Sequence, residues 1–117
     1  MGKKILIVDD MTMHLDYLSL ILLKEGYTAE IAHNGLDAFE KVRHFLPDLI
    51  LLDNIMPKMT GKELVEILKK DPVYKNIPII MFSASDEEEL PVDAYISKPI
   101  ITSDLLAKIR EILSKGR

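Results

Sequence analysis

Residues 47–61 read PDLILLDNIMPKMTG, and this stretch places an apolar run directly before an acidic residue. The run, Leu49 to Leu52, is apolar at every position, as a strand buried on both faces of a parallel sheet requires. Asp53 follows the run, and Met56-Pro57 then breaks the pattern. A carboxylate at the end of a buried strand makes this position a candidate functional site.

Short strand-like runs alternate with helical patterns along the chain. The predicted strands are Lys4 to Val8, Thr28 to Ala32, Asp48 to Leu52, Ile77 to Phe82 and Ala94 to Ile96. The predicted helices run from about Thr12 to Glu25, from Asn34 to Leu46, from Thr60 to just before Pro72, and from Thr102 or Ser103 to the terminus. This alternation predicts parallel strands joined by right-handed crossovers, with helices on both faces. The fold class is therefore a doubly wound α/β domain.

Composition narrows the class of protein further. A chain of 117 residues fits one domain, spanning residues 1–117, and 48% apolar residues suffice for a single core. No run is long enough to cross a membrane, and the start resembles no signal peptide, so we expect a cytoplasmic protein. Zero cysteines exclude thiol chemistry and disulfides. A net charge of −4 with scattered Lys and Arg argues against nucleic-acid binding.

Polar residues collect at the ends of four predicted strands. Asp9 and Asp10 follow the first run, Asp53 the third, Ser83 the fourth and Lys98 the fifth. In doubly wound sheets the carboxyl ends of the strands share one crevice, where ligands bind.

One such aspartate alone is more often a turn or capping residue, but three together repel and favour a bound cation. Because the available donors are oxygens, the hard cation Mg²⁺ fits best.

An ordered set of short motifs carries a family resemblance. The set comprises Asp9-Asp10, Asp53-x-x-Met-Pro57-x-x-x-Gly61, Ser83-Ala84 and Tyr95-x-x-Lys98-Pro99. Together they resemble the receiver domain of bacterial two-component response regulators over nearly the whole chain. The resemblance implies a flavodoxin-like sheet of five strands in the order 2-1-3-4-5.

The resemblance also implies a role for each motif residue. Asp53 would accept a phosphoryl group from a sensor histidine kinase or a histidine phosphotransfer protein. Mg²⁺ would be bound directly by Asp10, largely through water by Asp9, and by Asp53 and the backbone carbonyl of Ile55. Lys98 and Ser83 would contact phosphoryl oxygens. The protein modifies itself, so no turnover enzyme is expected.

Three further features are implied by the same resemblance. Ser83 and Tyr95 would form the conformational switch, and the bond before Pro99 would be cis. The partner surface would lie on the first helix and the loop after Lys98. Its candidate residues are Met13, His14, Tyr17, Ile100 and Ile101, for which ordinary helix packing is an equally good explanation.

Other functions remain open at this point. A haloacid-dehalogenase-like phosphatase also uses a strand-end aspartate and Mg²⁺, but it needs Asp-x-Asp where this chain has adjacent Asp9-Asp10. A flavin mononucleotide carrier needs a phosphate cradle where this chain has acids. A receiver that docks without being phosphorylated is a third alternative.

Two features depart from the family pattern. Asn54 follows the acceptor where an apolar residue is usual. Only residues 84–97 separate Ser83 from Lys98, which leaves little room for a crossover helix before the fifth strand. We therefore expect a truncated or absent fourth helix, and a monomeric relay or docking partner rather than a dimer through that face. A swapped dimer is the main competing outcome.

Overall fold

The computed structural model describes residues 2–53, 60–83 and 91–115. Its strands are β1 (Lys4–Val8), β2 (Thr28–Ala32), β3 (Leu49–Asp53), β4 (Ile79–Ser83) and β5 (Ala94–Ser97). All neighbouring strands are parallel, and their order in the sheet is β2-β1-β3-β4-β5. The predicted fold class and the strand order implied by the family resemblance are both confirmed.

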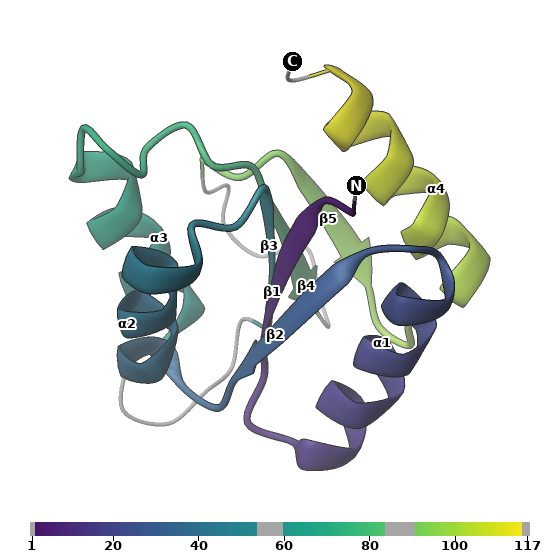
Figure 1. Cartoon of the computed structure of the whole chain (residues 1–117). Helices are drawn as coiled ribbons and strands as arrows, with labels where there is room; N and C mark the ends of the chain where they lie inside the picture. The colour runs from purple at the N-terminus through teal and green to yellow at the C-terminus, as the bar shows by residue number, and fades with distance from the viewer. Residues whose placement is uncertain (1, 54–59, 84–90, 116–117) are drawn as a thin grey trace.

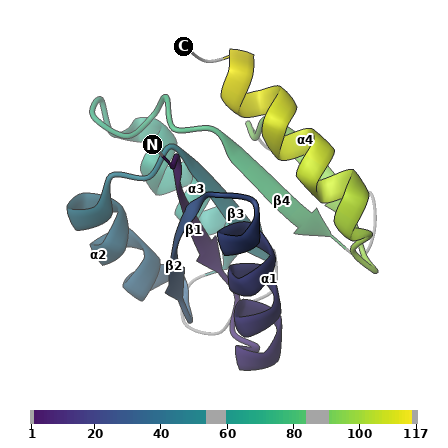
Figure 2. The same ribbon diagram turned by 45° about the vertical axis from the view of Figure 1, so that its right-hand side comes forward.

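The described helices cover both faces of this sheet. They are α1 (Thr12–Lys24), α2 (Gly35–Phe45), α3 (Gly61–Lys70) and α4 (Thr102–Lys115). Helices α2 and α3 lie on one face, and α1 and α4 lie on the other (Figure 1 and Figure 2). None of these helices, within the described ranges, is long and apolar enough to cross a membrane.

The sheet separates two hydrophobic cores. Side chains alternate along each strand, so Leu6 and Val8 pack toward α2 and α3 while Ile5 and Ile7 pack toward α1 and α4. Strand β3 lies between β1 and β4, and all five of its residues are buried. Its continuous apolar run is the consequence of having a packed helical layer on each side.

The connection from β4 to β5 is short, as predicted. The four described helices include none between these strands, since residues 91–93 are not helical and β5 begins at Ala94. Asp93 fixes the incoming chain, because Ile79 N donates to Asp93 Oδ1 at 2.9 Å and Asp93 N donates to Ile79 O at 2.8 Å. The rest of the connection, with Leu90, lies outside the described residues.

Strand boundaries differ slightly from the sequence prediction. Strand β3 begins at Leu49 rather than Asp48 and includes Asp53. Asp48 instead bonds the start of β1, because Lys4 N donates to Asp48 Oδ2 at 2.8 Å and Asp48 N donates to Lys4 O at 2.7 Å. Strand β4 begins at Ile79, after Pro78, which has no N–H to give to the ladder.

A capping box begins α3, as its sequence predicts. Glu63 N donates to Thr60 Oγ1 at 3.2 Å, and Thr60 N donates to Glu63 Oε1 at 2.8 Å. These two bonds satisfy backbone donors that the helix itself leaves unpaired. The start of α3 is therefore fixed by local chemistry.

Removing this cap should destabilise the protein. Thr60→Ala removes the hydroxyl that accepts from Glu63 N, so we expect the free energy of unfolding to fall by about 1 kcal/mol in urea denaturation. Thr60→Ser keeps the hydroxyl and should stay close to the unmodified protein. Equal losses in both variants would show that the threonine methyl, not the cap, carries the effect.

Candidate functional site

Three aspartates meet at the carboxyl ends of β1 and β3. Asp9 and Asp10 directly follow β1, and Asp53 is the last residue of β3. One carboxylate oxygen of each lies within 4.8 Å of those of the other two. Asp9 and Asp53 are buried, at 1% and 4% exposure, while Asp10 is exposed. The acid cluster predicted from the sequence is therefore present.

Both oxygens of Asp9 have a neighbour at the start of α1, one in its N-cap residue and one in its first turn. Met11 N donates to Asp9 Oδ1 at 2.9 Å, and His14 Nδ1 lies 3.1 Å from Asp9 Oδ2. Burial raises the pKa of Asp9 above its ordinary value; the Met11 hydrogen bond lowers it by less, and the charge of Asp53 raises it further. A bound cation would relieve both effects that raise it.

Lys98 balances part of the negative charge. Its Nζ donates to Asp53 Oδ1 at 2.7 Å, and its side chain is only 30% exposed. Lys98 directly follows β5, and its bond to Pro99 is cis, as expected. The ammonium of Lys98 therefore reaches across β4 to the end of β3.

The cluster fits a divalent cation. Three carboxylates and one ammonium carry a formal charge of −2, which one such ion neutralises. Their oxygens, within 4.8 Å of one another, lie close enough that a small adjustment would let them share one Mg²⁺ ion, with water as its further ligands. Asp9, Asp10 and Asp53 are the side chains that could hold it.

The structure describes only part of the other predicted site residues. Ser83 ends β4 in register with Ser97, and Tyr95 lies in β5 in register with Met81. The Ser83 side chain, Ile55 and Ala84 lie outside what the structure describes. Tyr95 is partly exposed, as expected for an aromatic residue on an edge strand.

A pocket of about 200 Å³ lies between α1 and the chain after β5. Its walls are formed by His14, Tyr17, Leu18, Lys98, Pro99 and Ile100. Tyr17 and Thr102 join its two sides through hydroxyl groups 2.9 Å apart. Of the predicted partner residues, His14, Tyr17 and Ile100 line this pocket, while Met13 and Ile101 are exposed outside it.

The contact between His14 and Asp9 was missed by sequence reasoning, which treated His14 only as a surface or partner residue. Helix α1 begins at Thr12, so His14 is its third residue. Side chains at this position can reach back over the helix start, as in a capping box. A polar residue there, five positions after an acid, is the signal that could have revealed the contact.

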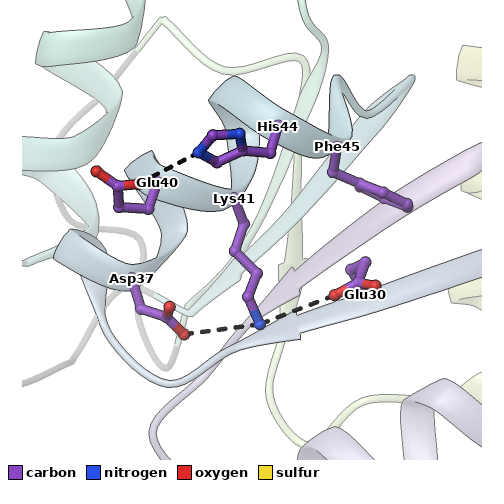
Figure 3. Close-up of a pocket in the computed structure, with 6 residues that line it drawn as sticks. All are labelled: Glu30, Asp37, Glu40, Lys41, His44 and Phe45. Carbon is purple, nitrogen blue, oxygen red and sulfur yellow. Dashed lines mark ion pairs between the residues drawn. The ribbon is translucent and has the colours of Figure 1, made fainter.

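A second pocket lies beside β2 and α2 and is lined by Glu30, Asp37, Glu40, Lys41, His44 and Phe45 (Figure 3). Lys41 Nζ bonds Ile31 O at 2.7 Å and lies 3.8 Å from Glu30 and 4.0 Å from Asp37. His44 lies 3.5 Å from Glu40. Because these ionisable groups already pair with one another, the acid cluster is the stronger functional candidate.

The fold and the strand-end site define a signalling receiver, and comparison with known proteins agrees. The family model for the response regulator receiver domain matches residues 5–110. A receiver domain protein (CheY-like) from Methanospirillum hungatei JF-1 is 36% identical, with 99% of this chain and 97% of that one covered and a TM-score of 0.91. The chain therefore belongs to the response regulator receiver domain family.

Two further solved structures show the same fold. The receiver domain of a signal transduction histidine kinase from Syntrophus aciditrophicus is 32% identical, with 97% of this chain and 91% of that one covered and a TM-score of 0.91. The receiver domain of a sensor histidine kinase from Pseudomonas aeruginosa PAO1 is 20% identical, with 98% of this chain and 100% of that one covered and a TM-score of 0.90. The latter holds a magnesium ion in its active-site cleft.

Family membership sets the general role. Receiver domains are signalling modules of two-component systems rather than turnover enzymes, and they interact with histidine kinases or phosphotransfer proteins. This favours the receiver interpretation over the phosphatase and flavin-carrier alternatives.

Removing the charge of Asp9 should stabilise the cation-free protein. An asparagine at position 9 keeps an acceptor for Met11 N–H and a polar group facing His14. It carries no charge, so it removes both the cost of burying a carboxylate and the repulsion from Asp53. We expect Asp9→Asn to raise the free energy of unfolding by about 1 kcal/mol at pH 7 in the presence of a chelator. Asp16→Asn, on the exposed side of α1, should change it little.

The sign of the pH dependence follows from the raised pKa of Asp9. The folded state binds the carboxyl proton of Asp9 more tightly than the unfolded state does. Asp9 therefore lowers stability as the pH rises from 3.8, the ordinary pKa of an aspartate, through the raised pKa of Asp9 in the folded protein. The advantage of Asp9→Asn should therefore be small below pH 3.8 and grow above it. Urea denaturation across this range measures it, and a destabilised variant at pH 7 would contradict the electrostatic explanation.

Proposed function

We propose that this chain is a phosphoacceptor receiver that takes a phosphoryl group from a phosphohistidine onto Asp53. The observation that carries the proposal is the 2.7 Å contact between Lys98 Nζ and Asp53 Oδ1, beside two further carboxylates. This arrangement combines a carboxylate nucleophile with cationic groups that can stabilise a phosphoryl group. Aspartyl-phosphates formed by such carboxylates are an established route of phosphoryl transfer.

The transfer exchanges one bond to phosphorus for another. A carboxylate oxygen of Asp53 forms the new P–O bond, and the P–N bond to the donor imidazole breaks. The electron pair of that bond stays on the imidazole nitrogen, which leaves as neutral imidazole when the other ring nitrogen carries a proton. Asp53 thereby loses its carboxylate charge, and Lys98 remains beside the charged phosphoryl oxygens.

The surrounding residues supply the remaining interactions. Asp10 and Asp53 would hold Mg²⁺ directly and Asp9 largely through water, and the backbone carbonyl of Ile55 would complete the protein's share of the ligands. When bound, the ion offsets negative charge on the transferred group. The Ser83 hydroxyl donates to a phosphoryl oxygen, so Ser83 and Tyr95 form the switch that reports phosphorylation. Support for this assignment comes from the donor set and the family membership.

In this proposal residues 1–117 form a single receiver domain. It works as a monomer in the cytoplasm and signals through protein contacts. Its phosphodonor docks on the first turns of α1 and the chain after β5. Met13, 80% exposed, and the pocket lined by Tyr17 and Ile100 support this surface. Such a partner would meet the protein beside Lys98.

Phosphorylation should depend on Asp53 and Mg²⁺. Incubation with a small acyl phosphate and Mg²⁺ should add one phosphoryl group by intact mass, because Asp53 is the nucleophile. Asp53→Asn should abolish the gain, and Asp104→Asn, an exposed residue of α4, should not. Equal phosphorylation of Asp53→Asn would refute the assignment. No phosphorylation of the unmodified chain by this donor or by any histidine donor would favour a docking module.

Docking should be separable from chemistry. Met13→Glu with Ile101→Glu places charges on two exposed apolar residues, so transfer from a phosphorylated histidine donor should slow by about 10-fold. Phosphorylation by the small acyl phosphate should be unchanged, because that donor needs no protein surface. Val73→Glu, an exposed apolar residue elsewhere, is the matched control. Equal slowing with both donors would show damage to the site rather than to docking.

A further inference from the structure

His14 makes one contact that the proposed function does not use, its hydrogen bond with Asp9. Its Nδ1 lies 3.1 Å from Asp9 Oδ2, and its ring also forms part of the wall of the 200 Å³ pocket. The side chain is 45% exposed, so its ring is not a filler of the hydrophobic core. We propose that His14 is a positioning residue that holds Asp9 in the orientation needed for cation binding. This inference rests on the proposed function, since it concerns the cation site of the same acid cluster.

The hydrogen-bond chemistry fixes the direction of this contact. An ionised carboxylate only accepts hydrogen bonds, so the imidazole Nδ1–H must donate to Asp9 Oδ2. Asp9 Oδ1 is held in turn by Met11 N at 2.9 Å. Both oxygens of this buried carboxylate are therefore restrained by groups at the start of α1. A carboxylate that is already oriented loses less conformational freedom when it binds a cation.

His14 acts through Asp9 rather than on the ion. Within the described ranges, the donor atoms that lie within 4.8 Å of one another come from Asp9, Asp10 and Asp53, and the nitrogens of His14 are not among them. Its position is that of a hydrogen-bonding group behind a carboxylate of the cation site, one that would hold the ion largely through water. Loss of such groups typically weakens metal binding by about 10- to 100-fold.

The pocket connects this restraint to the rest of the site. His14 and Lys98 both line it, and they contact Asp9 and Asp53, respectively. Two of the three acids are thus held by side chains that line the same pocket. His14 accordingly belongs to the cation site as well as to the partner surface.

A pair of substitutions of equal shape tests the proposal. The side-chain amide nitrogen of Asn can take the place of His Nδ1, whereas Leu has nearly the shape of Asn without a donor. We expect His14→Leu to weaken Mg²⁺ binding by about 10-fold in titration calorimetry, and His14→Asn to stay within about 2-fold of the unmodified protein. His44→Leu, at an exposed histidine of α2, should leave the Kd unchanged.

Each other outcome overturns the inference. Equal Kd values for His14→Leu and His14→Asn, whether unchanged or weakened alike, would show that the hydrogen bond does not position Asp9. Lack of measurable Mg²⁺ binding by the unmodified chain would overturn it as well. A drop in unfolding free energy without a change in Kd would assign His14 a purely structural role.

The two proposals fail in distinguishable ways. Phosphorylation of Asp53 together with equal Kd values in the His14 variants would refute the positioning role and leave the phosphoacceptor intact. A 10-fold loss in His14→Leu without any phosphorylation of Asp53 would do the reverse.

Discussion

The structure depends on a repulsion that the sheet imposes. Asp9, Asp10 and Asp53 are brought within 4.8 Å because β1 and β3 are adjacent parallel strands that end at the same edge. The buried apolar residues of those strands hold the carboxylates together against their charge. The contact between Lys98 and Asp53 offsets only part of it. Folding therefore holds like charges together at this site, and a bound cation would offset their repulsion.

The carboxyl-terminal end of the sheet brings together groups from four elements. The acids come from β1 and β3, the ammonium follows β5, and the imidazole of His14 comes from α1. The short connection between β4 and β5 still delivers Lys98 to its place, because Asp93 bonds Ile79 and sets the register. The position of Lys98 thus depends on the pairing of β5 with β4.

Much of this could be predicted from local patterns. The apolar runs and helical periodicity gave the alternation of elements, and polar residues after several runs indicated the acid cluster. The contact of His14 with Asp9 has only a weak sequence signal, a polar residue five positions after an acid, because its geometry depends on the angle at which α1 leaves β1. Likewise, Tyr17 and Thr102 are 85 positions apart, and only tertiary packing brings their hydroxyl groups together. The periodicity of a sequence indicates which face of a helix or strand is buried. Contacts such as those of His14 with Asp9 and Tyr17 with Thr102 depend instead on how whole helices and strands are placed relative to one another.

The buried and exposed faces of α1 tolerate substitution differently. Helix α1 packs Leu15, Leu18 and Leu22 against the sheet, while Met13 and Leu20 face outward. Substitutions at the outward positions remove little buried surface, so they change stability little. The outward face of α1, which carries part of the proposed docking surface, can therefore diverge in sequence at little cost in stability. The acid cluster and both cores would stay the same throughout such divergence.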